Sequence, residues 1–369
     1  MLNEAKEINR LPVITWRWLK VNELNLKELN LPEIKPYERE FLKTSSHGNV
    51  VVKSEFNIID FDNSIKDSST EYGVSEEVLK IAKDHKNTGV FIHAPRNEAS
   101  KEPIKIEFVM DKNNASVIDN NIIVAEENSH ITVVMEYKTE GEVQAFHNGI
   151  TKIYAKDGAR VNIIKVQTMN DHSYHFDSNV GFIGYGAEIN YVSVELGGKV
   201  SVTNYVNDLE KETSKADLKS IYLADKDRIV DLSYKMNHIG RRTESNIETR
   251  GVLKDKARKT FRGTLDFKKG AARSKGSEEE YALLLDSTVK SDAIPLLLCD
   301  EDDVEGAHAA SAGKVDEEKL FYLMSRGFNE KEAKLLIVEG SFRHIIDEIP
   351  VEDLREHIEK EVQRRLINE

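Results

Sequence analysis

The sequence contains a single cysteine, Cys299, among its 369 residues. One thiol excludes a disulfide within the chain and any metal site built from cysteine alone. Long apolar runs are also missing: the longest, Ala293 to Cys299, is far shorter than the ~20 residues that cross a bilayer. The first ten residues, MLNEAKEINR, lack the apolar stretch of a signal peptide. We therefore expect a cytoplasmic protein with no membrane partner.

Motifs for nucleotide hydrolysis and for common catalytic centres are absent as well. Neither Gly-Lys pair, at Gly198 and at Gly313, is followed by the Ser or Thr of a phosphate-binding loop. The sequence has no Gly-x-Ser-x-Gly, no His-Glu-x-x-His and no dinucleotide glycine fingerprint after a strand. We predict no catalytic residues, and any ATP hydrolysis must come from a partner.

Positive charge is in short supply. The chain has 65 acidic and 52 basic residues, a formal net charge of -13. Nucleic-acid binding depends on dense positive charge facing the phosphates, so we expect no nucleic-acid partner. The hydrophobic content of 39% is enough for a sizeable core.

The middle of the chain repeats itself. A small residue precedes an alternating apolar segment at Ser129, Ala159, Ala187, Ala216 and Ser245. A second series of short strand-like segments begins at Thr151, Asn179, Thr203, Leu232 and Phe261. A period of about 29 residues with two strands per repeat favours a stacked β-solenoid. A β-sandwich with regularly spaced strands is the alternative.

Three regions follow from these patterns: a mixed and helical region over 1–87, a β-solenoid over 88–313 and a helical region over 314–369. Ser75 is predicted to cap a helix in the first region. Asp316 is predicted to cap another that stops at Gly327, and Asn329 opens the next with Glu332 in a capping box. A last helix from about residue 351 carries an apolar seam, for which packing within the chain is favoured over docking of a partner.

The histidines inside the repeats point to structure more than to chemistry. His172 and His175 are three residues apart, which places them on opposite sides of a strand and makes them a poor metal clamp. His147 and His238 lie next to strand segments, where we expect buried, hydrogen-bonded side chains.

One segment does combine metal-binding side chains. Cys299 ends an apolar run, five of the next six residues are acidic, and His308 follows. A thiolate, carboxylates and an imidazole suit iron or zinc. An acidic loop that only joins two strands is the structural alternative.

These residues resemble the SufB/SufD family of the SUF iron–sulfur cluster assembly system. The run DDVEGAHAASAGKVDEEKLFYLMSRGF from Asp302 is similar to the C-terminal signature of that family. The segments GVLKDKARKTFRGTLDF from Gly251 and LPVITWR from Leu11 resemble two further family patterns. The cysteine of the SufB scaffold type is missing from SEEEYALLLDST after Gly276, so the chain looks SufD-like.

The resemblance implies a mainly β fold: a right-handed parallel β-helix core flanked by N-terminal and C-terminal helical regions. It also implies a non-catalytic subunit of the assembly scaffold, which pairs with a SufB-type protein through the β-helix ends and carries a SufC-type ATPase. The iron–sulfur cluster is then held only transiently, together with the partner subunit, and no tightly bound cofactor is expected.

The resemblance also assigns roles to individual residues. His308 matches the histidine that SufD-type proteins place at the SufB interface as a cluster or metal ligand. Gly306 replaces the family cysteine two positions earlier, and Cys299 could substitute for it. The ATPase-binding side chains are expected in the C-terminal helices: Leu320, Phe321, Tyr322, Arg326, Leu335, Leu336 and Phe342.

Two other functions stay open. A divergent family member could pair with a second copy of itself in place of a SufB-type protein. Outside the family, a parallel β-helix is common among enzymes that act on polysaccharides, but those present rows of acidic and basic residues along one exposed face. In this chain the acidic residues cluster in one loop, Asp300 to Glu305. A metal-storage protein would need more ligands than one histidine and one cysteine.

Overall fold

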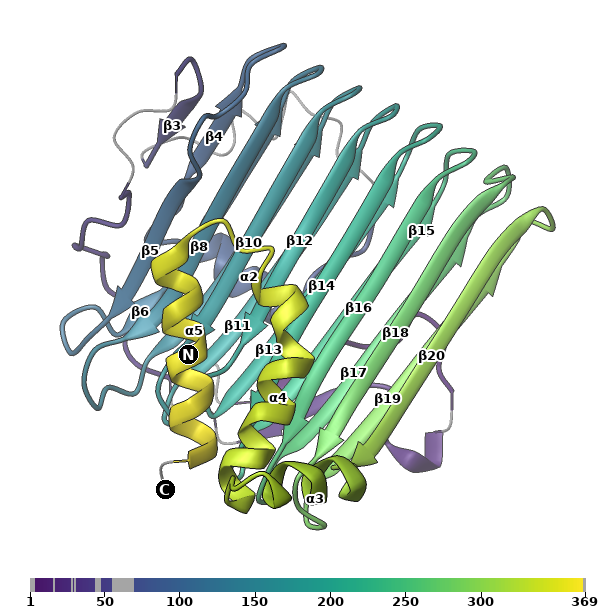
Figure 1. The fold of residues 1–369 in the computed structure, drawn as a ribbon. Helices are drawn as coiled ribbons and strands as arrows, with labels where there is room; N and C mark the ends of the chain where they lie inside the picture. The colour runs from purple at the N-terminus through teal and green to yellow at the C-terminus, as the bar shows by residue number, and fades with distance from the viewer. Residues whose placement is uncertain are drawn as a thin grey trace.

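The alternating strand segments form two parallel sheets that face each other (Figure 1). A computed structural model describes residues 4–15, 17–27, 29, 31–43, 48–54 and 70–367. Trp16 of the LPVITWR motif lies outside the described residues. The chain passes from one sheet to the other and back in each turn, and neighbouring turns are hydrogen-bonded in parallel. The predicted parallel β-helix is therefore confirmed, and the β-sandwich alternative is wrong.

The strands of the described residues fall into three sheets. In spatial order, the eight-stranded sheet contains β20 (Val304–Lys314), β18 (Ser274–Leu284), β16 (Glu244–Leu253), β14 (Lys215–Ala224), β12 (Glu188–Glu195), β10 (Arg160–Thr168), β8 (His130–Thr139) and β5 (Ile104–Met110). The facing ten-stranded sheet contains β19 (Lys290–Cys299), β17 (Arg258–Phe267), β15 (Ile229–His238), β13 (Val200–Leu209), β11 (Tyr174–Ile183), β9 (Phe146–Ala155), β7 (Asn120–Ala125), β4 (Phe91–Ala94) and β3 (Val51–Lys53), with β6 (Ser116–Val117) paired to β9. A separate antiparallel ribbon pairs β1 (Glu4–Ile8) with β2 (Leu24–Lys27).

The strand register corrects the sequence alignment at one turn. The repeat placed Thr203 against Asn179, whereas in the structure Thr203 lies opposite Asp177. A two-residue shift in the opposite direction separates Ala216 from its expected neighbour Ala187, because Ala216 lies opposite Ile189. Spacing alone could not reveal the shift, because a shift of two residues preserves which side chains face inward.

A glycine corner explains the shorter turn. From Glu195 to Val200 the chain is two residues shorter than over the equivalent stretch from Gln167 to Tyr174 in the preceding turn. Gly198 has a φ of +78° in this corner, a backbone conformation that side chains disfavour. A Cβ at the neighbouring Gly197 would lie 2.1 Å from the Met169 carbonyl of the preceding turn, so glycine lets this short corner pack close to that turn.

The interior between the two sheets holds most of the core. Inward-facing side chains of successive turns stack on one another, as Val161 does on Ile131 and Ile189 in the neighbouring strands. All three are fully buried in one continuous apolar cluster. Each turn thus covers the apolar residues of the turn before it, which no single turn could bury alone.

The C-terminal helices cover the outer face of the eight-stranded sheet (Figure 1). They are α3 (Glu317–Ser325), α4 (Glu330–Ile346) and α5 (Glu352–Ile367). Asp316 caps α3 and Asn329 with Glu332 forms the capping box of α4, as predicted. The apolar seam of α5 packs against α4 and the sheet, which confirms the prediction of packing within the chain.

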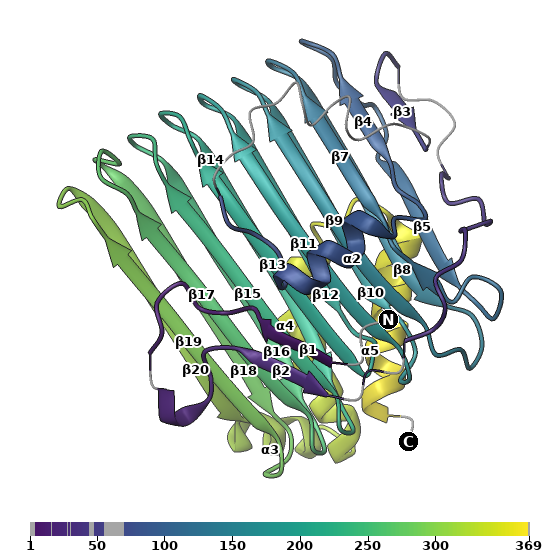
Figure 2. The ribbon, with the colours of Figure 1, turned by 180° about the vertical axis from the view of Figure 1, so that it is seen from behind.

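The N-terminal elements lie across the outer face of the ten-stranded sheet (Figure 2). They comprise the β1–β2 ribbon, a short 3-10 helix η1 (Arg17–Leu19) and α2 (Glu76–Asp84). Ser75 caps α2 as predicted, and Val78 and Ala82 bury its inner face. The Asn9 side chain after β1 donates to the Thr203 carbonyl at 3.1 Å and to the Asp231 carboxylate at 2.8 Å. Within the described residues, no helix is both long and apolar enough to span a membrane.

Val161 offers a direct test of the stacked interior. Val161→Asp would place a carboxylate without a partner in the middle of the apolar cluster, at a cost of about 3–5 kcal/mol of unfolding free energy. We expect a large drop in the urea midpoint followed by circular dichroism. Arg160→Gln, one residue earlier on the exposed face, is the control and should unfold like the wild type.

Candidate functional site

The β-helix has an open end at its last turn. Strands β19 and β20 each have a hydrogen-bonded neighbour on one side only in the described structure. The outer edge of each strand therefore presents unpaired backbone N–H and C=O groups, which readily pair with another chain. The inward-facing side chains of this turn have no further turn above them.

His308 is one of these inward-facing side chains. It lies opposite the buried Glu278 of β18 in the register, and residues paired across neighbouring strands face the same side. A Cβ at Gly306, two residues earlier, would touch the interior side chains Leu297 and Phe267, which confirms the inward direction. His308 is nevertheless exposed, because β20 is the last strand of its sheet and no strand of the described residues lies over it.

The two sequence-predicted ligands do not meet. Cys299 ends β19, is exposed, and stacks on Phe267 of the preceding turn. Leu297 contacts the Gly306 position, so Cys299 lies at the level of Val304, four strand residues or about 13 Å from His308. The acidic residues after Cys299 lie in the corner between β19 and β20. Within the described residues, no three His, Cys, Asp or Glu side chains are arranged to hold a metal ion.

Two buried acids, Glu278 and Glu280, lie on β18, the strand next to β20 in the interior of the β-helix. Glu280 pairs with the Lys259 ammonium at 2.5 Å and accepts from the Tyr222 hydroxyl at 2.9 Å. Glu278 is 3% exposed and its Oε2 atom has no hydrogen-bond partner. Burial, with a further contribution from the Glu280 charge, raises the pKa of Glu278 to about 8. Glu278 is therefore largely protonated and neutral near pH 7.

Deeper in the interior lies a second polar cluster. The Nδ1 atoms of His147 and His175 are 2.8 Å apart, and His147 Nε2 lies 2.7 Å from the Asp119 carboxylate. One ring must donate and the other accept, so at most one of them carries a positive charge. Lys165 and Asp177 complete the cluster with an ion pair of 2.9 Å.

Burial controls the charge state of this cluster. It lowers the pKa of His175 well below the usual range, and the neighbouring positive charge adds to the effect. Burial also raises the pKa of Glu195 to about 8, although Ser201 donates to its carboxyl at 2.6 Å. For Asp119, His147 and Lys165 outweigh the opposite effect of burial and hold the pKa below its ordinary value. The cluster is sealed from solvent, so it serves the fold and offers no open ligand site.

His147 and His238 are buried and hydrogen-bonded, as predicted. His238 lies 2.7 Å from Thr243 Oγ1 and 2.8 Å from Ser245 Oγ, and burial lowers its pKa to about 4. His172 is exposed while His175 is buried, in agreement with the prediction that the two side chains lie on opposite sides.

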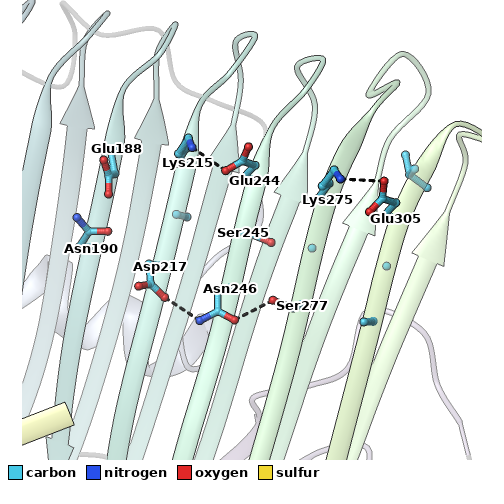
Figure 3. Close-up of a pocket in the computed structure, with 15 residues that line it drawn as sticks. Glu188, Asn190, Lys215, Asp217, Glu244, Ser245, Asn246, Lys275, Ser277 and Glu305 are labelled. Atoms are coloured by element: carbon cyan, nitrogen blue, oxygen red, sulfur yellow. Dashed lines mark hydrogen bonds and ion pairs between the residues drawn. The ribbon is translucent and has the colours of Figure 1, made fainter. Parts of the chain in front are cut away.

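A shallow groove of about 710 Å³ lies on the outer face of the eight-stranded sheet (Figure 3). Its side chains form ladders along the β-helix axis. Lys215 pairs with Glu244 at 2.6 Å and Lys275 with Glu305 at 2.9 Å, while Asn246 donates to Asp217 at 3.0 Å. These groups satisfy one another, which favours a structural role over the ligand-binding face of a polysaccharide enzyme.

Sequence comparison supports the resemblance drawn from the motifs. Residues 108–341, more than half of the chain, match the family model described as "SUF system FeS cluster assembly, SufBD core domain". The chain belongs to the SufBD family. The match covers most of the β-helix, the open end with His308, and the helices α3 and α4 up to residue 341.

Individual SufBD relatives are similar at moderate identity. The iron-sulfur cluster assembly protein SufD of Bacillus subtilis is 28% identical over 76% of this chain and 64% of its own length. A SufBD family protein of Mycobacterium leprae is 30% identical over 71% of this chain and 30% of its own length. One from Staphylococcus epidermidis is 28% identical over 72% of this chain and 57% of its own length. The chain thus matches less than two thirds of the length of each of these relatives.

The residues expected to bind the ATPase divide into exposed and buried groups. On α3, Phe321 is 75% exposed and Tyr322 57% exposed, with the Arg326 guanidinium 5.1 Å from the Tyr322 ring. Leu336 on α4 is 39% exposed. Leu320 is partly buried, and Leu335 and Phe342 lie in the apolar cluster between the helices and the sheet. The buried side chains can hold the helices in place, but they cannot themselves contact a partner protein.

The sequence analysis missed the buried acids and the histidine pair, although signals for both were present. His147 and His175 are 28 residues apart, one repeat, and so occupy the same position in successive turns. Glu278 and Glu280 flank Glu279 on one strand. Strand alternation therefore places Glu278 and Glu280 on one face and Glu279 on the other, so at least one acid must face inward.

Glu195→Gln tests the buried protonation state. The folded-state pKa of Glu195, about 8, exceeds its ordinary value of 4.5. Wild-type stability from this group is thus present below pH 4.5 and is lost as the pH rises toward 8. We expect the variant to be more stable than wild type by about 3 kcal/mol at pH 7, with the difference vanishing near pH 4.5. Urea unfolding across this pH range measures the effect, and Glu188→Gln on the outer face of the same strand should show none.

Proposed function

We propose that this chain is a SufD-like, non-catalytic subunit of a SUF iron–sulfur cluster assembly scaffold. It pairs through the open end of its β-helix with a SufB-type protein and binds a SufC-type ATPase through its C-terminal helices. Iron, sulfide and the nascent cluster are cargo, held transiently at the junction with the partner. The proposal places the protein in the cytoplasm, with no nucleic acid or membrane partner.

The observation that carries this proposal is that two candidate contact surfaces, the open edge of β20 and the helix α3, lie close together at one end of the molecule. Strand β20 leaves its edge unpaired and presents His308, and α3 begins three residues after β20 ends. A strand edge of eleven residues favours extension of the sheet by a strand from another chain. Any conformational change of a protein bound at α3 would be transmitted directly to this edge.

Exposed apolar side chains on the helices support the ATPase contact. Phe321, Tyr322, Met324 and Phe328 are each at least 40% exposed, within eight residues of one another. Contiguous exposed aromatic groups are typical of protein–protein contact sites. The chain has no phosphate-binding loop of its own, so a partner ATPase would supply hydrolysis.

A second copy of this chain is the other candidate for the strand edge. Both SufB-type and self-pairing use the same unpaired groups of β19 and β20. The two arrangements differ in composition and are distinguished by the mass of the purified complex.

Tyr322→Asp tests the docking of the ATPase. A charge in the centre of the exposed aromatic cluster should weaken co-purification with a co-expressed SufC-type ATPase by at least about tenfold, because an aromatic contact of this kind is worth ~2 kcal/mol. The variant should fold normally, since Tyr322 is 57% exposed. Pull-down yield measures binding, and native mass spectrometry reports whether the strand edge holds a SufB-type protein or a second copy.

Tyr185→Asp is the matched control, because Tyr185 is 55% exposed in a corner between two strands. It should bind the ATPase like the wild type. Failure of the unmodified chain to bind any SufC-type ATPase would contradict the proposed role. Removal of everything after Gly327 is a poorer test, since it would uncover the apolar face beneath α4 and α5.

His308→Ala tests the role of the open end. Within the described structure His308 is exposed and packs under no further strand, so the variant should keep the melting temperature of the wild type. We expect the yield of clusters in the reconstituted complex to fall several-fold, followed by visible absorption. His172→Ala, which removes an exposed histidine from a distant corner, should leave the yield unchanged. An equal yield from His308→Ala would remove this imidazole from the site.

A further inference from the structure

The inner wall of the eight-stranded sheet ends in a short column of polar side chains. Glu278 and Glu280 of β18 face inward, with Glu279 between them facing out. In the strand register, His308 of β20 is the neighbour of Glu278, and Ala310 is the neighbour of Glu280. His308 is thus the first inward-facing polar group met from the open end, and Glu278 is the next one below it.

The two acids on this wall differ in what they bind. Glu280 is satisfied by Lys259 and Tyr222. Among the described residues, Glu278 pairs with no cation and its Oε2 atom has no hydrogen bond, although its side chain is only 3% exposed. A buried carboxyl oxygen without a partner destabilises the fold. A contribution to folding stability therefore does not explain why a glutamate stands at position 278.

The opposite wall makes room for this carboxyl and supplies no partner. A Cβ at Gly263 would lie 2.1 Å from the carboxyl carbon of Glu278, so only glycine leaves space for it. The residue above Gly263 in the next turn is Pro295, and the described residues offer no hydrogen bond to Glu278 Oε2. On the wall that carries Glu278, the next inward-facing polar side chain toward the open end is His308.

From this arrangement we propose that Glu278 and His308 form an iron(II) site at the mouth of the β-helix interior. An imidazole nitrogen and a carboxylate oxygen suit Fe(II). Solvent, or a chain paired at the open edge, completes the coordination, since no third donor of this chain is in place. Glu278 would bind as the carboxylate and release its proton to water when the metal enters. Cys299, at the level of Val304, takes no part.

This inference rests on the proposed function in treating iron as cargo, but it is tested without the assembly partners. Anaerobic titration of the purified full-length chain with Co(II), a spectroscopic substitute for Fe(II), gives affinity and ligand type together. We expect one Co(II) per chain, ligand-field bands of nitrogen and oxygen ligation, and no thiolate-to-cobalt charge-transfer band. His308→Ala and Glu278→Gln should each weaken binding by at least about tenfold.

The controls follow from the two faces of β18. Glu279→Gln makes the same change one residue away on the outer face, where Glu279 pairs with Arg250 at 2.7 Å, and should bind Co(II) within twofold of wild type. Glu278→Gln preserves shape and the neutral state of the buried group and, as for Glu195→Gln, should melt no lower than the wild type at pH 7, which separates loss of metal binding from loss of fold.

Three results would overturn the inference. They are binding unaffected by Glu278→Gln, a thiolate charge-transfer band that disappears in Cys299→Ser, and no stoichiometric Co(II) binding by the wild-type chain. None of these would affect co-purification with the ATPase, so failure of the iron site and failure of the proposed function remain distinguishable.

Discussion

The structure depends on the stacking of equivalent side chains in successive parallel turns. Inward-facing Ile131, Val161 and Ile189 each shield a neighbour from water, and hydrogen bonds between turns hold the register that keeps them aligned. Such a column needs a further turn to cover each turn it contains. The final turn is always left with an open strand edge and uncovered inner side chains. In this chain that turn is β19 and β20, and the uncovered group is His308.

Polar groups inside the column follow the same rule. Where a charged side chain is buried in the middle, the next strand of the chain, on the facing sheet, supplies its partner, as for Lys165 with Asp177 and Lys259 with Glu280. Glu278 departs from this pattern one turn below the open end. A buried acid that the fold leaves unsatisfied next to an exposed imidazole is the kind of exception that function explains better than stability.

The C-terminal helices show how one segment serves both fold and recognition. Phe342 and Leu335 close the apolar outer face of the eight-stranded sheet, while Phe321 and Tyr322 remain in solvent. The division follows from position: α4 and α5 lie along the sheet, whereas α3 follows directly after β20, has no fully buried residue and packs only the partly buried Leu320 against the apolar cluster. The anchored helices hold the exposed one at a fixed place beside the open strand edge.

Local and periodic features were readable from the sequence. The caps at Ser75, Asp316 and Asn329 depend on residues within four positions of each other, and the solenoid repeats its apolar pattern every turn. The register past the glycine corner, the separation of Cys299 from His308, and the approach of Glu278 to Gly263 were settled only by the tertiary structure. Each of these depends on which residue of one turn lies above which residue of the next, and the length of a corner, invisible to a pattern of alternating side chains, fixes that.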